Sequence, residues 1–266
     1  MDVIGVDFSG ARDAGAKTWV AAATWCDGTL RVTDCRSLAA RAGTADRAPA
    51  LSHLCDLLAA HDGPAGLDFS FGLPRAVLDP AATWPDGLAI VAAHEGPDAL
   101  RATCTERAHA HADGDRTFLK RATDERTGAS SPYHWLVAHQ TFYGVRDVLA
   151  PLVDRGASAP PMRRGDPPWL CEIYPAATLR SCSLPDRRYK DDARHDGARG
   201  RRARIVDGLA ARTPLEVDAD TRETLVADEG GDALDSVVAA LAAWRAWRAD
   251  FAPVEPWTPV EGHIYV

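Results

Sequence analysis

The feature that most constrains the fold of this chain is a short apolar run that ends in Asp-Phe-Ser and occurs twice. The first copy, residues 3–10, reads Val-Ile-Gly-Val-Asp-Phe-Ser-Gly, and the second, within residues 65–74, repeats the Asp-Phe-Ser ending. Apolar runs this short, bounded by turn residues, are typical of buried strands. We therefore predict two buried strands with an aspartate, Asp7 or Asp68, at the far end of each.

We expect these two aspartates to lie close together, because the segment between their strands contains a predicted helix. Residues 47–60 repeat leucine at helical spacing and end at a Gly-Pro pair. A crossover helix makes the two strands parallel, and neighbouring strands lie about 4.8 Å apart. Two carboxylates at that range repel each other, and an oxygen-bound divalent cation relieves the repulsion. The alternative for either aspartate alone is that it caps a turn, but the pair favours a metal site.

Further strands complete the predicted sheet. Residues 17–25 read as a second strand, and Asp27-Gly28 gives a strong hairpin signal before a third strand that ends at Arg36. Residues 169–175 read as a fifth strand and carry an acid, Glu172, near its end. A lone buried glutamate is costly unless it is paired or liganded, so Glu172 joins the predicted site; the alternative is an edge strand that exposes it.

Residues 75–166 separate the fourth and fifth strands and read as a largely helical insertion, because several prolines interrupt them. Within this insertion we predict a charged helix over 97–112 and a more apolar helix over 134–153, with a kink or break at Pro151. We expect a single domain over residues 1–266 that carries this insertion.

A late helix supplies two more candidate acids. Residues 230–241 begin with Gly-Gly and continue as an Ala-rich helix in which Asp232 and Asp235 are three residues apart, so both point from one face near its start. Aspartate is favoured at helix N-termini as a cap and by the helix dipole. We expect one of the two to cap the helix and the other to reach the site.

Composition excludes several classes of protein. The six cysteines form no Cys-x-x-Cys pair, which argues against a zinc knuckle or redox motif. No basic-then-apolar leader opens the sequence and no apolar run approaches the roughly 18 residues of a membrane span, so we expect a cytoplasmic protein with no membrane partner. The formal net charge of −8 is not typical of nucleic-acid-binding domains, which tend to be basic.

One segment of this acidic chain is rich in basic residues. Eight arginines and lysines fall within residues 186–204, diluted by four aspartates. The segment either faces phosphates or forms a solvated helix start, and its residues do not decide between the two.

The motifs together resemble a known family. An Asp on the first strand, further acids on later strands and a late Asp-x-x-Asp helix resemble the RNase H-like fold, in the arrangement of Holliday-junction resolvases. More closely, the phrases Gly-Val-Asp-Phe-Ser-Gly, Asp-Phe-Ser-Phe-Gly-Leu-Pro, Glu-Ile-Tyr-Pro, Asp-Ala-Leu-Asp and Glu-Gly-His-Ile-Tyr-Val resemble the family known as domain of unknown function 429, described as predicted RNase H-like nucleases. This likeness spans nearly the whole chain. It implies a three-layer α/β fold with a mixed five-stranded sheet of order 3-2-1-4-5, strand 2 antiparallel.

The resemblance also implies a mechanism, which is hydrolysis of nucleic-acid phosphodiester bonds with two Mg²⁺ or Mn²⁺ ions about 3.5 to 4 Å apart. Asp7 would bridge the ions, and the other acids would hold them on either side. The metals would activate water and stabilise the leaving oxyanion, so no general-base histidine is required. The implied catalytic and metal-binding residues are Asp7, Asp68, Glu172, Asp232 and Asp235. The candidates for substrate binding are Ser9, Arg121, Arg187 and Lys190.

Two rival functions remain open. The opening Val-Asp-Phe-Ser-Gly also resembles the first phosphate loop of actin-like kinases, but these need a second half with a glycine-rich phosphate loop, which is not evident in the sequence. The other rival is a non-catalytic scaffold or nucleic-acid-binding protein of the same fold. Metal binding at Asp7 separates a nuclease from a scaffold, whereas the oligomeric state and the type of nucleic acid have no signal in the sequence.

Overall fold

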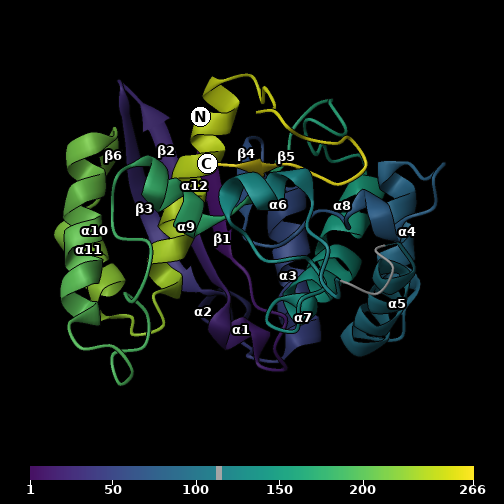
Figure 1. Cartoon of the computed structure of the whole chain (residues 1–266). Coiled ribbons are helices and arrows are strands. Elements are labelled where there is room, and N and C mark those ends of the chain that lie inside the picture. The colour runs from purple at the N-terminus through teal and green to yellow at the C-terminus, as the bar shows by residue number, and fades with distance from the viewer. Residues whose placement is uncertain (112–115) are drawn as a thin grey trace.

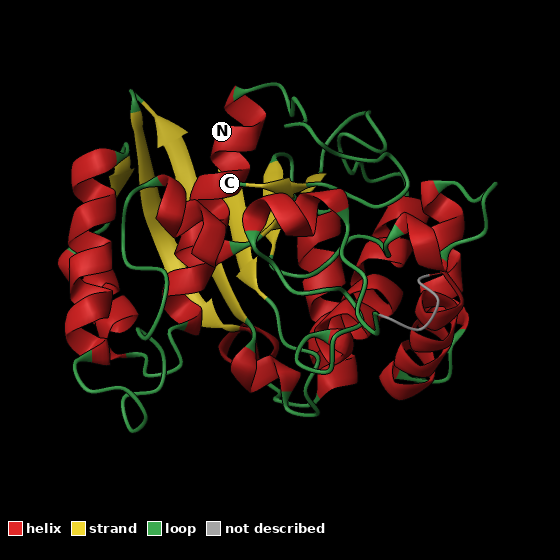
Figure 2. Ribbon diagram, viewed as in Figure 1, coloured by secondary structure: helices red, strands yellow, loops and turns green. Residues whose placement is uncertain are grey.

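The structure is a computed structural model that describes residues 1–111 and 116–266. Within these residues seven strands form one mixed sheet (Figures 1 and 2). The strands are β1 (Asp2–Asp7), β2 (Trp19–Cys26), β3 (Thr29–Ser37), β4 (Pro64–Leu67), β5 (Trp169–Ile173), β6 (Leu215–Glu216) and β7 (Ile264–Tyr265).

The helices that flank the sheet are mostly short, and Figure 2 shows them on both sides of it. Before β5 they are α1 (Ala14–Lys17), α2 (Leu38–Ala42), α3 (Arg47–Ala59), η1 (Arg75–Val77), α4 (Trp84–Ala93), α5 (Pro97–His111), α6 (Ala122–Thr127), α7 (Ala138–Gly144), η2 (Val145–Leu149) and α8 (Ala150–Asp154). After β5 they are α9 (Pro175–Ser181), α10 (Ala198–Arg212), α11 (Ala219–Ala227) and α12 (Asp232–Arg248).

The sheet is larger than the sequence predicted. Its order is β6-β3-β2-β1-β4-β5-β7, so the expected five strands form the middle in the expected order. The expectation of five strands in all was wrong. Strand β2 is antiparallel to β1 and β3, whereas β4 is parallel to β1 and to β5. The two additional strands are edge strands of two residues each, too short for a periodic apolar pattern to reveal them.

The first hairpin forms where its turn residues predict it. Asp27 and Gly28 connect β2 to β3 and both have positive φ, 51° and 81°, the backbone that Asp-Gly turns favour. Strand β2 begins at Trp19, later than the predicted Lys17, because Lys17 ends the short helix α1.

Helices cover both faces of the sheet. Ile4 and Val6 of β1 face a buried cluster that includes Leu54 of α3, which covers one face as the predicted crossover helix. The opposite face carries α12, and Val3 packs there against Val237. Figure 1 shows α12 across that face, with α10 and α11 toward the β6 edge.

Two glycines let α12 approach the sheet closely. A Cβ on Gly5 of β1 would lie 2.0 Å from the carbonyl oxygen of Ser236, and a Cβ on Gly66 of β4 would lie 2.4 Å from that of Ala239. Both approaches are shorter than real Cβ contacts, so only glycine fits there. The glycines therefore seat the start of α12 against the two strands that carry the Asp-Phe-Ser motif.

The predicted insertion is helical and shares the main core. Val145 and Leu149 belong to the same buried cluster as Val6 and Phe8. The charged helix predicted over 97–112 is α5, Pro97–His111, while Ala112 lies outside the described residues. The apolar helix starts at residue 138, later than predicted, and runs through α7, η2 and α8 to residue 154.

A π-helical segment, rather than a break, accommodates Pro151. The five residues of η2 directly precede the turn that contains this proline. Proline has no N–H to donate to the carbonyl four residues earlier. In this helix that carbonyl belongs to Asp147. The thiol of Cys55 donates to the Asp147 oxygen at 3.0 Å instead, so the helix continues without an unsatisfied carbonyl.

The C-terminal segment packs on the body of the protein through β7. Strand β7 pairs in parallel with β5, with Ile264 opposite Glu172. The described residues contain no helix with the length and apolar character that crossing a bilayer demands.

Candidate functional site

The two Asp-Phe-Ser aspartates lie at neighbouring strand ends, as the sequence predicted. Asp7 is the last residue of β1, and Asp68 directly follows β4. Val6 stands opposite Leu67 in the parallel register, and the N–H of Asp68 donates to the carbonyl of Val6 at 3.0 Å. Asp7 is buried and Asp68 is half-buried. Both carboxylates therefore start from the same edge of the sheet.

Helix α12 adds a third carboxylate, that of Asp235. This side chain is buried, and its Oδ1 accepts a hydrogen bond from the hydroxyl of Tyr189 at 2.8 Å. The ammonium of Lys190 lies 2.6 Å from Oδ2 of Asp235 and 3.3 Å from Oδ1 of Asp232. Asp232 lies nearer the solvent, with 28% of its side chain exposed. Lys190 thus places a positive charge among the acids.

The pKa values of these groups follow from burial and crowding. Burial raises the pKa of Asp7 well above its usual value; Lys190 lowers it, and Asp235, Asp232 and Asp68 raise it. Burial and the charge of Asp235 raise the pKa of Asp68 to about 7. Burial alone would lower the pKa of Lys190, but Asp235, Asp7 and Asp232 raise it overall. Burial and crowding thus raise the pKa values of Asp7, Asp68 and Asp235, while the nearby carboxylates favour the charged form of Lys190.

The start of α12 is capped differently from the prediction. Among the residues that the structure describes, neither Asp232 nor Asp235 accepts a hydrogen bond from the free N–H groups at the helix start. Asp228, four residues before Asp232, accepts from the N–H of Ala233 at 2.8 Å, and Gly231 occupies the cap position with φ of 71°. The expectation that one of the pair caps the helix was wrong, since the capping acid lies in the preceding turn.

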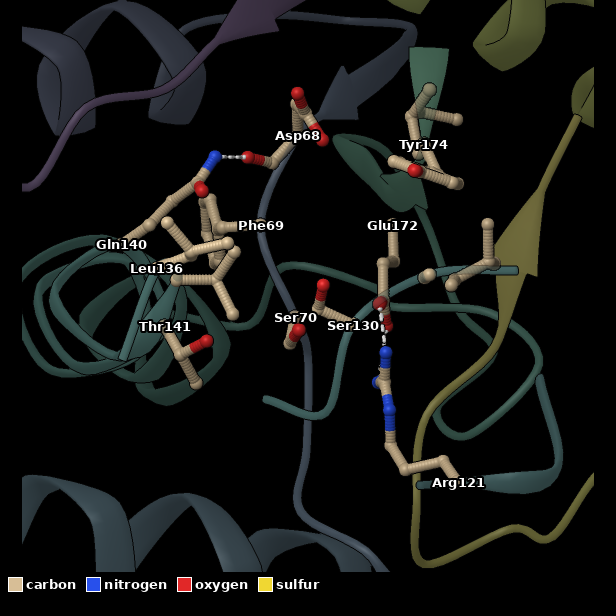
Figure 3. Close-up of a pocket in the computed structure, with 14 residues that line it drawn as sticks. Asp68, Phe69, Ser70, Arg121, Ser130, Leu136, Gln140, Thr141, Glu172 and Tyr174 are labelled. Atoms are coloured by element: carbon tan, nitrogen blue, oxygen red, sulfur yellow. Dashed lines mark hydrogen bonds and ion pairs between the residues drawn. The ribbon is translucent and has the colours of Figure 1, made fainter. Parts of the chain in front are cut away.

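Glu172 lies one residue before the end of β5 but has a different partner from these acids. Its Oε2 accepts from Nη1 of Arg121 at 2.8 Å and from the N–H of Phe71 at 3.0 Å (Figure 3). Arg121 also pairs with Asp124 and is 1% exposed. Burial raises the pKa of Glu172, and Arg121 lowers it. Glu172 is therefore the paired buried glutamate that its sequence context required, and the guanidinium that pairs it is closed to solvent.

The C-terminal segment closes this ion-pair network with a residue that the sequence analysis missed. The carboxylate of Glu261 accepts from the N–H groups of Arg75 at 2.7 Å and of Ala122 at 3.0 Å, while its carbonyl accepts from Arg121 at 3.0 Å. Glu261 stands in the closing Glu-Gly-His phrase, which was the available signal. Only the fold shows that this phrase lies against the insertion.

The basic segment splits into structural and exposed residues. Arg202 is fully buried and binds Asp192 at 2.7 Å. Arg187, Arg188 and Arg194 are exposed and line a cavity of about 440 Å³. Lys190, Asp235 and Asp68 line the same cavity. The segment is therefore partly buried structure and partly exposed side chains, and the contact of the exposed arginines with phosphates stays a prediction.

Ser9 has a local structural role. Its N–H donates to the hydroxyl of Thr18 at 3.1 Å, and its own hydroxyl accepts from the N–H of Ala11 at 3.3 Å. These bonds shape the turn that follows Asp7.

The carboxylates fit a hard divalent cation by chemistry, since Mg²⁺ and Mn²⁺ prefer oxygen ligands. As the side chains stand, residues 1–111 and 116–266 include no group of three or more His, Cys, Asp or Glu arranged to hold a metal ion. The short contact between Lys190 and Asp235 gives the physical reason, because an ammonium lies among the acids.

Residues 5–256 match the family described as "Protein of unknown function (DUF429)". The chain belongs to this family. No curated protein and no solved structure matches it. The DUF429 match covers both Asp-Phe-Ser motifs, β5 and the whole of α12, so the five acids predicted from the sequence lie inside the family region, whereas Glu261 lies beyond it.

Proposed function

We propose that this DUF429 protein is a metal-dependent nuclease with an RNase H-like fold, which hydrolyses phosphodiester bonds of nucleic acid. The run β3-β2-β1-β4-β5, with β2 antiparallel, supports the fold assignment. The observation that carries the function is the convergence of Asp7, Asp68 and Asp235, from two adjacent strands and a helix, on one lysine beside an arginine-lined cavity.

The proposed metal ligands are a subset of the acids that the sequence suggested. Asp7, Asp68 and Asp235 would hold Mg²⁺ or Mn²⁺, with Asp232 at the exposed rim. Glu172 would instead position the end of β5 through its bonds to Arg121 and the N–H of Phe71. When bound, two such ions supply an activated water and stabilise the leaving oxyanion.

Lys190 and the three arginines of the cavity would contact different groups. Lys190 neutralises the buried acids and keeps them together while its side chain remains 42% exposed. A divalent cation would take over these carboxylates, which frees the ammonium to contact a phosphate. Arg187, Arg188 and Arg194 line the adjacent cavity and would hold flanking phosphates of the strand.

The test is a cleavage assay with labelled single-stranded and branched DNA and RNA in Mn²⁺. We expect the wild type to cut at least one substrate. Asp7→Asn should lose cleavage by at least about a hundredfold, because the carboxylate shared by the site is gone, while it retains binding. Asp207→Asn is the matched control, since Asp207 pairs with Arg222 on the surface and its loss should leave cleavage unchanged.

Three results would contradict the proposal. Cleavage by Asp7→Asn at the wild-type rate would show that these acids take no part in the reaction. Consumption of ATP with a sugar or nucleoside, without any cutting, would favour the actin-like phosphotransferase. Binding without cutting or phosphate transfer would favour the scaffold.

A further inference from the structure

A second cavity lies on the other side of Asp68 from the arginines. It has a volume of about 200 Å³ and is enclosed by the residues after β4, the loop before α7 and the end of β5 (Figure 3). Asp68 and Tyr174 line both this cavity and the arginine-lined one. A group bound here would therefore lie next to the proposed reaction site.

The lining of this cavity combines aromatic and hydroxyl groups. Phe69 and Tyr174 contribute ring surfaces, while Ser70, Ser130 and Thr141 contribute hydroxyls. Figure 3 shows Ser70 and Ser130 in the middle of the lining, with Thr141 on the side away from Glu172.

One of these hydroxyls needs a partner that the chain does not provide. Thr141 is 1% exposed, and its Oγ1 has no hydrogen-bond partner among the described residues. A buried hydroxyl without a partner carries a desolvation cost. Gln140, beside it, donates through Nε2 to the carbonyl of Asp68 and so turns its amide toward the strand end. The cavity thus presents an unused polar group at its wall.

An exposed apolar side chain also lies at this cavity. Leu136 lines it, and Leu136 and its neighbour Trp135 are each 61% exposed. Large exposed apolar side chains at a cavity mark binding sites, and exposed aromatic rings are surfaces on which bases of a single strand stack.

We propose that this cavity binds one single-ringed, pyrimidine base of the nucleic-acid strand whose phosphate lies at Asp7 and Asp68; this inference rests on the proposed function and deepens it. A 150 Å³ cavity is known to hold benzene, so about 200 Å³ admits one ring with its exocyclic oxygens or amino group. The hydroxyl of Thr141 meets the polar edge of the base, and Phe69 or Tyr174 meets its face. A base inside a duplex cannot enter such a cavity, so the substrate is single-stranded or has an unstacked base at this position.

The test measures binding in EDTA, where metal-dependent cutting cannot occur. The probes are fluorescent ten-residue strands of thymidine, uridine, adenosine, or abasic deoxyribose with the same number of phosphates. We expect at least one of the two pyrimidine strands to bind about tenfold more tightly than the abasic strand and more tightly than the adenosine strand.

Matched variants assign the effect to the cavity. Thr141→Val removes the unpartnered hydroxyl at nearly constant shape and should reduce the preference for pyrimidine over abasic strands to within about twofold. Thr178→Val is the control: Thr178 is likewise fully buried with an unpartnered hydroxyl, but it lies in α9 outside the cavity lining. If Thr141→Val fails to fold, Ser130→Leu is the second variant. Ser130 is a half-buried residue of the lining, so leucine there would fill the cavity.

The outcomes separate this inference from the proposed function. Equal binding of pyrimidine and abasic strands overturns the base site, even if the strands are cut in Mn²⁺. A pyrimidine preference that Thr141→Val or Ser130→Leu abolishes supports the base site, even if nothing is cut. A preference that survives both variants overturns the assignment to this cavity, and failure of every strand to bind overturns the inference together with the nucleic-acid function.

Discussion

At the scale of single residues, two strand-end carboxylates differ through their partners. Asp7 lies near one ammonium that it shares with Asp235 and Asp232, whereas Glu172 accepts two charge-assisted bonds from Arg121 and another from a backbone N–H. A carboxylate that accepts from a guanidinium and from a backbone N–H has both oxygens occupied. The one without such a partner remains available to a cation from solvent.

The Arg121 network should contribute strongly to stability. Arg121→Met leaves Glu172 and Asp124 buried without their counter-charge, and removal of one partner from a buried ion pair costs about 3–5 kcal/mol. Urea unfolding should show this loss in the free energy of unfolding. Arg31→Met is the control, because Arg31 pairs with Glu216 at the surface with 65% of its side chain exposed. It should cost at most about 1 kcal/mol. If Arg121→Met lowers the free energy of unfolding by as little, burial of Glu172 does not depend on its pairing with Arg121.

At the scale of elements, the placement of α12 determines whether Asp235 reaches the strand-end acids. The helix lies against β1 at Gly5 and against β4 at Gly66 without room for a Cβ. Asp235 precedes Ala239 by one helical turn, so the same contact that packs the helix sets the position of its carboxylate.

Gly5→Ala should therefore destabilise the protein and weaken the proposed site together. The added Cβ would meet backbone atoms of Ser236 and Ala240 at 2.0 and 2.2 Å. Backbone cannot yield cheaply, so we expect a loss of at least about 1–3 kcal/mol. Gly200→Ala is the control, since Gly200 lies in α10 with nothing within 4 Å, and alanine there should stabilise by up to about 1 kcal/mol. Thermal unfolding measures both, and an unchanged melting temperature for Gly5→Ala would contradict the close approach.

At the scale of the whole molecule, the crowded acids link the stability of the fold to pH. The pKa of Asp68 is about 7 in the folded protein and about 3.9 in an unfolded chain. Between these values the folded state binds more protons than the unfolded state, so the free energy of unfolding decreases as pH rises. Asp7 and Asp235, whose pKa values are also raised, act in the same direction.

We therefore expect the metal-free protein in EDTA to lose stability as pH rises from about 4 to about 7. Asp68→Asn should flatten this slope, because its amide does not titrate. Mn²⁺ should reverse the loss near pH 7, since a ligand that binds only the folded state stabilises it. Urea unfolding across this pH range measures all three effects, and a slope unchanged in Asp68→Asn would show that Asp68 titrates normally.

Local pattern alone was enough to predict much of this protein. The crossover helix α3, the Asp27-Gly28 turn and the acids Asp7 and Asp68 at the ends of parallel strands all follow from periodicity and turn chemistry, which act over a few residues. The edge strands β6 and β7 did not follow, because two residues carry no period and pair only where a distant strand offers an edge.

Within the site, the sequence by itself determined which acids could meet, and the tertiary structure decided how each is used. Arg121 and Glu261 lie 51 residues before and 89 residues after Glu172, yet they close one buried network around it. No spacing rule connects residues so far apart. In the sequence, every arginine and lysine is an equally good candidate to pair with Glu172, until packing excludes water and brings one of them near. Once an ion pair is buried, separating its charges is costly. Glu172 therefore stays bound to an arginine, while Asp7 and Asp235 share a lysine.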